Sequence, residues 1–230
     1  MRNVIIALVL LLSAPVMAED SRRIVVNGHG VVETVPDMAT VSMGVVSEAK
    51  TAGDAMAENS DALALVLKQL TAAGIESRDI QTNNLSLSPR WDNRSSGVSG
   101  QPQISGFIAT NTVSVRVRDL AQLGQVLDAV VENGANSFNG LSFGLQDMKP
   151  AQDAARVAAV KDAMAKAQLY ATAAGVKLGD VVSISDVSRR NAAPAMFGVN
   201  ADMMRSAAVP VAQGELSVTA DVTIVFGIAD

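Results

Sequence analysis

Residues 71–80 read TAAGIESRDI, and they contain the signals that end one element and begin the next. A glycine after an alanine-rich segment is typical of a helix C-terminus, because glycine readily adopts the left-handed backbone that closes the last turn. Residues 172–181, TAAGVKLGDV, repeat this pattern, while residues 131–141 share only the helix end and its glycine. Such echoes arise by duplication or by convergence of helix-to-strand connections on the same chemistry. In both cases they mark helix-to-strand units, which favour an α+β fold.

Each of these glycines follows a segment with helical periodicity, so we expect helices over residues 51–73, 120–132 and 151–174. The inward stripe of the first comprises Ala52, Ala55, Met56, Asn59, Leu63, Val66, Leu67, Leu70 and Ala73. That of the second comprises Leu123, Val126, Leu127 and Val130. That of the third comprises Val157, Val160, Met164, Ala167, Ala171 and Ala174. The third helix is rich in alanine, which favours helix formation and close packing on a sheet.

Strands are expected where β-branched residues and alternation of apolar with polar positions coincide. They span residues 24–32, 40–48, 80–90, 107–117, 140–145, 181–187 and 215–226. The last places Leu216, Val218, Ala220, Val222, Ile224 and Phe226 on one side. Val35-Pro36-Asp37 separates the first two strands and predicts a turn, hence a hairpin. The fold class is therefore α+β, a mixed and largely antiparallel sheet layered with about three helices.

Two long segments lack this periodicity. Residues 90–105 are rich in Gly, Ser, Pro and Asn, and we expect an exposed hairpin loop there. Residues 189–213 are long for a loop in a compact domain, which usually indicates function, oligomer contact or disorder. Residues 19–230 are expected to form one α+β domain, with a division into two lobes left open.

The first 18 residues have the pattern of a secretory signal peptide. Arg2 is followed by the apolar run Val4 to Leu12, and Val16-Met17-Ala18 forms a small-x-small cleavage site. The run is about nine residues, whereas a membrane-spanning helix needs roughly 20. We therefore expect cleavage after Ala18, export to the periplasm and a mature chain without a transmembrane segment.

Composition excludes several classes of function. The formal charge is -5, which argues against binding to nucleic acid or to anionic membranes. The chain has no cysteine, which excludes disulfides, thiolate nucleophiles and cysteine-ligated metal sites. Aromatic residues make up 3% of the chain, so base stacking and carbohydrate platforms are poorly supported. Stability must come from a core of aliphatic residues and alanine.

The single histidine lies in residues 25–37, VVNGHGVVETVPD. A dinucleotide fingerprint needs a third glycine and a following helix, but Glu33 and another strand come next. His29 could pair with Glu33 or Asp37, yet a hydrolytic triad also needs a serine. No G-x-S-x-G occurs, and the nearest match, Ser95-Ser96-Gly97, falls in the exposed loop. The glycines are better explained by a bent strand or a close neighbour, and we expect no catalytic residue and no cofactor.

One histidine without cysteine cannot supply a metal site of the usual kind, and we expect none. Methionines leave two possibilities open in the segment 189–213. Met196, Phe197, Met203 and Met204 make it apolar and are candidate oligomer contacts. Alternatively, the Met-rich residues 196–204 bind a soft metal such as Cu(I), or a small ligand.

A series of short motifs, in order along the mature chain, resembles the SIMPL-domain family of bacterial envelope proteins. The series comprises Gly28-x-Gly30, Pro36-Asp37-Met38-Ala39, Gly74-Ile75, Asp79-Ile80-Gln81-Thr82, Ile104-Ser105-Gly106-Phe107, Asn111-Thr112-Val113, Asp119-Leu120, Gly134-Ala135, Tyr170-Ala171, Gly175, Leu178-Gly179-Asp180 and Gln213-Gly214-Glu215. Gln213 departs from the proline usual in the family. The family includes periplasmic immunogenic proteins and proteins of oxidative-stress defence.

The resemblance implies an α+β fold in the periplasm, homo-oligomers in some members and a protective role under oxidative stress. It supplies no known catalytic residue, in agreement with the residues themselves. The sequence thus predicts a non-enzymatic, exported envelope protein that assembles with itself and contributes to oxidative-stress defence. A periplasmic binding module that uses residues 196–204 is the alternative.

Overall fold

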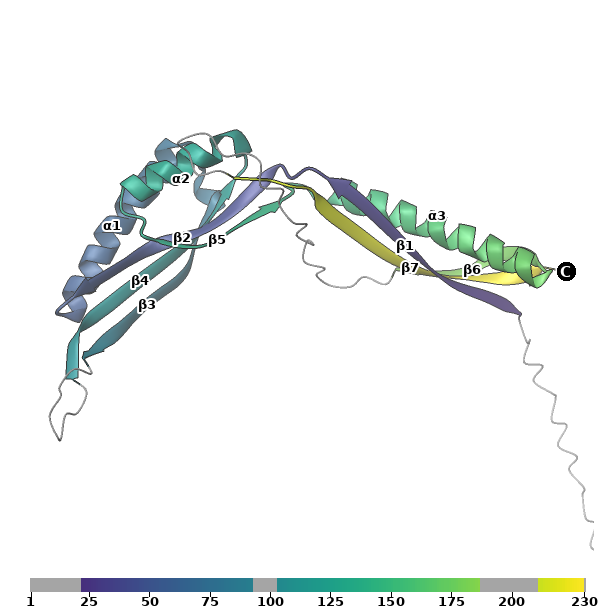
Figure 1. Ribbon diagram of the computed structural model, residues 1–230, viewed down its shortest axis with the longest axis horizontal. Helices are drawn as coiled ribbons and strands as arrows, with labels where there is room; N and C mark the ends of the chain where they lie inside the picture. The colour runs from purple at the N-terminus through teal and green to yellow at the C-terminus, as the bar shows by residue number, and fades with distance from the viewer. Residues whose placement is uncertain (1–21, 93–102, 187–210, 230) are drawn as a thin grey trace, which may run out of the picture.

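The computed structural model describes residues 22–92, 103–186 and 211–229. The elements in chain order are β1 (Arg23–Thr34), β2 (Met38–Ala49), α1 (Ala52–Ala72), η1 (Ser77–Asp79), β3 (Ile80–Asp92), β4 (Gln103–Val117), η2 (Leu120–Gln122), α2 (Leu123–Glu132), β5 (Ser137–Gly144), α3 (Lys149–Ala174), β6 (Lys177–Asp186) and β7 (Leu216–Ala229). The strands form two antiparallel sheets, in the orders β1-β7-β6 and β3-β4-β2-β5. Figure 1 shows the two sheets, each with its helices, end to end in a bent molecule. The predicted α+β class is confirmed.

The four-stranded sheet packs against α1, and α2 packs beside α1 (Figure 1). Val41, Met43 and Val45 of β2 are buried, with Val113 and Val115 of β4 beside them. The helices contribute the stripes expected from their periodicity. The buried residues are Ala55, Asn59, Leu63, Val66 and Leu70 of α1 and Leu123, Val126, Leu127 and Val130 of α2. One core therefore joins this sheet to its two helices.

The three-stranded sheet packs against α3 and has a core of its own. Alternate residues of β7 point toward the helix, as the sequence predicts. Leu216, Val218, Val222, Ile224 and Phe226 are buried, and the last three belong to this core, with Ala220 partly buried against it. The helix contributes Ala159, Ala163 and Ala167 to this core. The second core is thus built from large side chains of the sheet and methyl groups of the helix.

The predicted hairpin of β1 and β2 is wrong. β1 pairs with β7, and β2 pairs with β4 and β5, so the two strands belong to different sheets. The turn between them is where the chain crosses from one sheet to the other. Sequence proximity favours a hairpin, but it cannot show that β4 and β5 pair with the two edges of β2 and leave no edge for β1. Tertiary pairing therefore overrides the local turn signal.

The predicted inward face of α3 is also wrong in part. Ala167 and Ala171 are buried as expected, but Val157 is 54% exposed and Met164 is 52% exposed. The buried stripe instead consists of Ala155, Ala159, Ala163, Ala167 and Ala171. The reason lies in β1, whose glycines bring the strand so close to the helix that larger side chains do not fit between them.

The ends of the three helices agree with the sequence signals. Gly74, Gly134 and Gly175 have positive φ of 84°, 109° and 70°. The next residue in each case donates its N–H to a carbonyl five residues back, as in a Schellman cap. The pairs are Ile75 to Leu70, Ala135 to Val130 and Val176 to Ala171. At the other end of α1, the side chain of Thr51 accepts from the N–H of Asp54.

The first predicted loop, residues 90–105, is shorter at both ends than expected. β3 continues to Asp92 and β4 begins at Gln103, so strand pairing extends into the region assigned to the first loop. Residues 93–102 and most of the second loop, 187–210, lie outside the described residues. Within the described ranges, no helix has the length and apolar character needed to cross a membrane.

Candidate functional site

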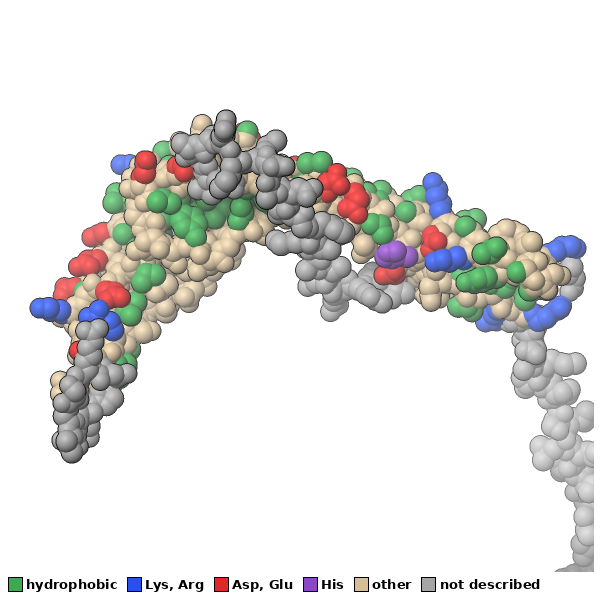
Figure 2. All heavy atoms as spheres, in the orientation of Figure 1, with side chains coloured by type: hydrophobic (Ala, Val, Ile, Leu, Met, Phe, Trp, Pro, Cys, Tyr) green, Lys and Arg blue, Asp and Glu red, His purple; other side chains and the backbone are tan. Residues whose placement is uncertain are grey.

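His29 lies on the face of β1 that points away from α3, and Figure 2 shows it on the molecular surface. Its Nδ1 is 2.8 Å from Oδ1 of Asp221, the residue directly opposite on β7. Glu33 and Asp37, the two partners considered from the sequence, have other partners. Glu33 accepts from the hydroxyl of Ser217, and Asp37 accepts from the backbone of Gln146. Asp221 was missed because a separation of 192 residues carries no local signal.

The Asp221 carboxylate could orient the His29 imidazole as a general base. Few other reactive groups of the described chain lie beside this pair. Thr219 and Thr223 each lie two residues from Asp221 on the same face of β7, and the hydroxyl of Thr223 donates to Oδ1 of Asn27 at 2.8 Å. Across residues 22–92, 103–186 and 211–229, no three His, Cys, Asp or Glu side chains come together to hold a metal ion. Among the described residues, the pair therefore has no companion groups for metal-assisted chemistry.

Two side chains of α3 bind backbone groups of β1 on the edge of the strand that pairs with no other strand. Oδ2 of Asp162 accepts the backbone N–H of His29 at 2.8 Å and Nζ of Lys166 at 2.6 Å. Lys166 also donates to the carbonyl of Asn27 at 3.1 Å. The hydrogen bond from Lys166, and then that from His29, hold the pKa of Asp162 below its usual range. Because β1 is an edge strand, these contacts occupy backbone groups that another chain could otherwise bind.

A polar network fixes the two crossings between the sheets. Oδ1 of Asp37 accepts the N–H of Gln146 at 2.7 Å, and the N–H of Asp37 donates to the carbonyl of Gly144 at 3.1 Å. Nε2 of Gln146 donates to the carbonyls of Asp37 and Arg118 at 3.1 and 3.3 Å. The β1–β2 and β5–α3 connections are thereby tied together at one place.

Arg118 links this network to a buried carboxylate. Its Nε and Nη2 donate to the two carboxylate oxygens of Asp79, each at 2.7 Å. This hydrogen bonding lowers the pKa of Asp79, while burial of the carboxyl opposes the shift in part. Asp79 immediately precedes β3, and Arg118 immediately follows β4, so the pair holds the ends of both strands together.

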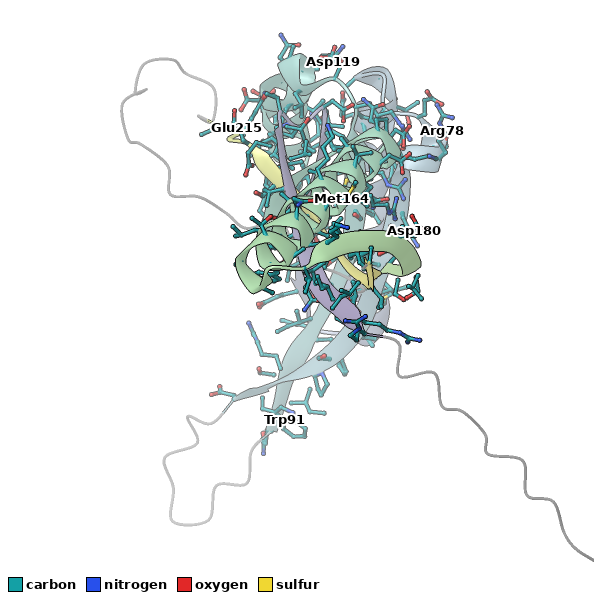
Figure 3. All side chains as sticks on the ribbon, turned by 90° about the vertical axis from the view of Figure 1, so that its right-hand side faces the viewer. Arg78, Trp91, Asp119, Met164, Asp180 and Glu215 are labelled. Carbon is teal, nitrogen blue, oxygen red and sulfur yellow. The ribbon has the colours of Figure 1, made fainter. Side chains whose placement is uncertain are left out.

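Exposed apolar side chains include three groups, on the β3–β4 hairpin, on β6 and on α3. Those on the β3–β4 hairpin are Leu85, Leu87, Trp91 and Ile104. Those on β6 are Val181, Val182 and Ile184, and those on α3 are Val157, Met164, Leu169 and Tyr170. Figure 3 labels Trp91 and Met164 and shows them on different parts of the molecule. Contiguous exposed apolar surface is a feature of binding sites, so these surfaces are the candidates for contacts with partners.

A groove of about 450 Å³ runs between α1 and α2. It is lined by Gln69, Ala72, Ala73, Gln122, Gln125, Val126 and Ala129. Amide and methyl groups dominate this lining, and no charged side chain contributes to it. The groove therefore contains no group that would select a charged ligand or start a reaction.

The remaining predicted sites lie outside the described residues. They are the cleavage site after Ala18 and the candidate oligomer contacts Met196, Phe197, Met203 and Met204. Both remain predictions from the sequence.

Comparison with known proteins agrees with the motif series. The family model for SIMPL, described as a protein of unknown function (DUF541), matches residues 24–226. The chain belongs to the SIMPL family. The 26 kDa periplasmic immunogenic protein of Brucella melitensis is 37% identical over 229 residues, covering 94% of this chain and 91% of the relative. The uncharacterized protein YggE of Escherichia coli K12 is 32% identical over 197 residues, covering 85% and 76%.

Several SIMPL landmarks named from the sequence have a structural role here. A Cβ at Gly28 or Gly30 would lie 2.0 Å from a carbonyl oxygen of α3, so these positions admit the helix. Asp37 fixes the crossing between the sheets through Gln146. Gly214 has φ of 60°, so the turn before β7 keeps a left-handed residue beside the divergent Gln213. These landmarks are explained by packing and chain direction rather than by chemistry.

Proposed function

We propose that this SIMPL protein is a non-enzymatic, exported envelope protein that self-assembles and contributes to oxidative-stress defence. The observation that carries the proposal is the exposed apolar surface of β6 and α3. Aliphatic side chains in a strand at the edge of a sheet favour association, because backbone and side chains can both be covered by another chain.

Export is supported by the signal-peptide pattern of residues 1–18. It is also supported by the Brucella relative, which is named a periplasmic immunogenic protein. Location in the periplasm with cleavage after Ala18 is therefore part of the proposal. N-terminal sequencing of the protein from a periplasmic extract tests it, and a mature chain that begins at Glu19 is expected.

A non-enzymatic role is supported by the environment of His29. Its ring bonds to Asp221 across the strand pair, and no nucleophile motif accompanies it in the sequence. The replacement His29→Ala should therefore leave protection against peroxide intact in a complemented deletion strain. Loss of protection with a normally folded variant would contradict this part of the proposal.

Self-assembly is tested by native mass measurement of the mature protein at micromolar concentration, with metal content read from the same sample. A mass of several chains without bound metal is expected. A mass of one chain would contradict assembly. Deletion of residues 196–210 tests the Met-rich segment as a contact, and a smaller assembly is the expected result.

The soft-metal alternative is tested by titration with Cu(I) under reducing conditions. A variant with Met196→Leu, Met203→Leu and Met204→Leu together is the matched control. Stoichiometric copper that disappears in this variant would favour the binding module over the proposed role. Equal copper in both proteins would remove residues 196–204 as its site.

A further inference from the structure

The dipeptide Asn-Gly occurs three times in the chain, at residues 27–28, 133–134 and 139–140. In this dipeptide the backbone nitrogen of glycine can attack the side-chain amide carbon of asparagine, because glycine carries no Cβ that obstructs the approach. The succinimide ring that forms requires rotation of the backbone and an asparagine side chain free of other bonds. The local structure therefore decides which of the three dipeptides reacts.

The first dipeptide, Asn27-Gly28, is held by its neighbours. β1 pairs with β7 in an unbroken register over its whole length. Oδ1 of Asn27 accepts from the hydroxyl of Thr223 at 2.8 Å, and its carbonyl accepts from Nζ of Lys166 at 3.1 Å. A Cβ on Gly28 would lie 2.0 Å from the carbonyl oxygen of Ala159, so no space for a ring exists beside α3. Reaction here requires β1 to leave the sheet.

The second dipeptide, Asn133-Gly134, is held by the C-terminal cap of α2. Nδ2 of Asn133 donates to the carbonyl of Ala129 at 2.7 Å, and Oδ1 accepts from Nε2 of Gln69 at 3.3 Å. The N–H of Gly134, which carries the attacking nitrogen, donates to the carbonyl of Val131 at 3.3 Å. The leaving group and the nucleophile are thus both bound.

The third dipeptide lies in β5, an edge strand of the four-stranded sheet. Ser42 of β2 pairs with Gly140, and Met43 pairs with Phe138, so the register passes over Asn139. Asn139 is therefore the extra residue of a β-bulge, which is left unpaired where the ladder is disrupted. Asn139 and Gly140 are both exposed.

The surroundings of Asn139 leave its side chain and the next peptide free to move. No side chain or backbone group of residues 22–92, 103–186 or 211–229 makes a hydrogen bond with the Asn139 amide. A Cβ on Gly140 would meet no atom within 4 Å, in contrast to Gly28. Gly140 also has φ of 153°, which glycine adopts without the strain of a side chain. The restraints that hold the other two dipeptides are missing here.

We propose that Asn139-Gly140 is a site of spontaneous deamidation. The backbone nitrogen of Gly140 forms a bond to Cγ of Asn139, the bond from Cγ to Nδ2 breaks, and the amide leaves as ammonia with the proton of the Gly140 N–H. Water then opens the succinimide at either carbonyl, which gives aspartate or isoaspartate. No oxidant, cofactor or enzyme takes part.

The modification changes the edge strand in charge and in length. Both products add one carboxylate to β5, and isoaspartate also adds one carbon to the backbone just before Leu141. The side chain of Leu141 packs partly buried against the first core. The isoaspartyl form therefore displaces the part of β5 that follows the bulge from its register with β2.

The test incubates the purified mature protein at mildly alkaline pH and follows the three dipeptides by peptide mass spectrometry. Asn139 should deamidate at least about ten-fold faster than Asn27 and Asn133, because those two sites react only when the structure around them opens. The rate at Asn139 should rise with pH, since the attacking nitrogen must lose its proton. In denaturant the three rates should agree within about three-fold, because the local structure that separates them is lost.

Asn139→Gln is the matched variant, because its longer side chain would have to close a less favourable six-membered ring. The peptide should then stay unmodified, and circular dichroism checks that the variant is folded. Asn139→Ser replaces it if it does not fold. Similar rates at the three sites of the folded protein, or faster reaction at Asn27 or Asn133, would overturn the proposal. Aspartate without isoaspartate at position 139 would overturn the succinimide route.

Discussion

Gly28 and Gly30 set the distance between β1 and α3. A Cβ on Gly28 would lie 2.0 Å from the carbonyl oxygen of Ala159, and one on Gly30 would lie 2.0 Å from that of Ala155. Backbone atoms cannot move aside as flexible side chains can, so the strand and the helix would have to separate. The N-G-H-G stretch is therefore a packing surface, and its histidine points to the opposite face.

Gly28→Ala and Gly30→Ala should each lower the free energy of unfolding by about 3 kcal/mol, because overpacking in a well-packed core costs this much. Urea denaturation followed by circular dichroism measures it. Gly53→Ala is the control, since a Cβ there meets its nearest atom at 4.0 Å within α1. That variant should be neutral or more stable by up to about 1 kcal/mol. Equal effects at all three positions would contradict the close approach.

Asp79 makes stability depend on pH in the acidic range. Its carboxyl is buried and bound by Arg118, and its pKa in the folded protein is lowered. The usual value is about 3.9. A carboxyl with a lowered folded pKa contributes stability that is present above the unfolded pKa and lost as pH falls through the folded pKa. The contribution should therefore begin to fall near about pH 3.9 and be lost below the lowered folded pKa.

Arg118→Met should cost about 3 kcal/mol at pH 7, because it leaves a buried carboxylate without its partner. The cost should shrink as pH falls below about 3.9, where protonation neutralises Asp79. Urea denaturation at a series of pH values measures both. Arg90→Met, which removes the exposed pair with Glu48, is the control and should cost less than about 1 kcal/mol. A loss for Arg118→Met that is independent of pH would contradict the role of Asp79.

At the scale of elements, α3 shows why apolar periodicity identified the helix but not its buried face. Valine and methionine are larger and more apolar than alanine, so the pattern favours them as core residues. The glycines of β1 reverse this choice, because the space they leave admits only alanine. The larger residues Val157 and Met164 stay outside.

Ala163→Leu should lower the free energy of unfolding by about 2 to 3 kcal/mol, since the side chain is fully buried beside Gly28. Ala165→Leu, on the exposed side of the same helix, should change it by less than about 0.5 kcal/mol. Thermal unfolding, followed by the circular dichroism signal of the helices, compares the two variants. Equal destabilisation by both would show that α3 is rotated relative to the sheet described here.

At the scale of the molecule, two separate cores follow from the two sheets. We propose that they act as two α+β lobes that unfold independently, because all the buried residues of each core lie in one sheet, its helices and the turns that join them, and of the segment before β7 only Val211 packs on the first core. At the crossings of the chain, Asp37 and Gln146 tie the sheets together by hydrogen bonds.

Hydrogen exchange should then detect two units of different stability. Leu70→Ala should weaken the four-stranded unit and Phe226→Ala the three-stranded unit, each by about 3 kcal/mol. In each variant, protection of the other unit should stay within about 0.5 kcal/mol of the parent, as expected for distant sites. If either variant lowers protection throughout the chain, the protein unfolds as one unit.

The sequence by itself determined the helices with their glycine caps, most strand positions and the inward faces of α1, α2 and β7, because these follow from local propensity and periodicity. It also determined that His29 lacks the sequence context of a catalytic site, since no nucleophile motif accompanies it. The tertiary structure decided that β1 joins β7 across the length of the chain, that His29 meets Asp221 and that α3 buries alanine. Such contacts depend on which distant backbones lie side by side, and no local interaction encodes that choice.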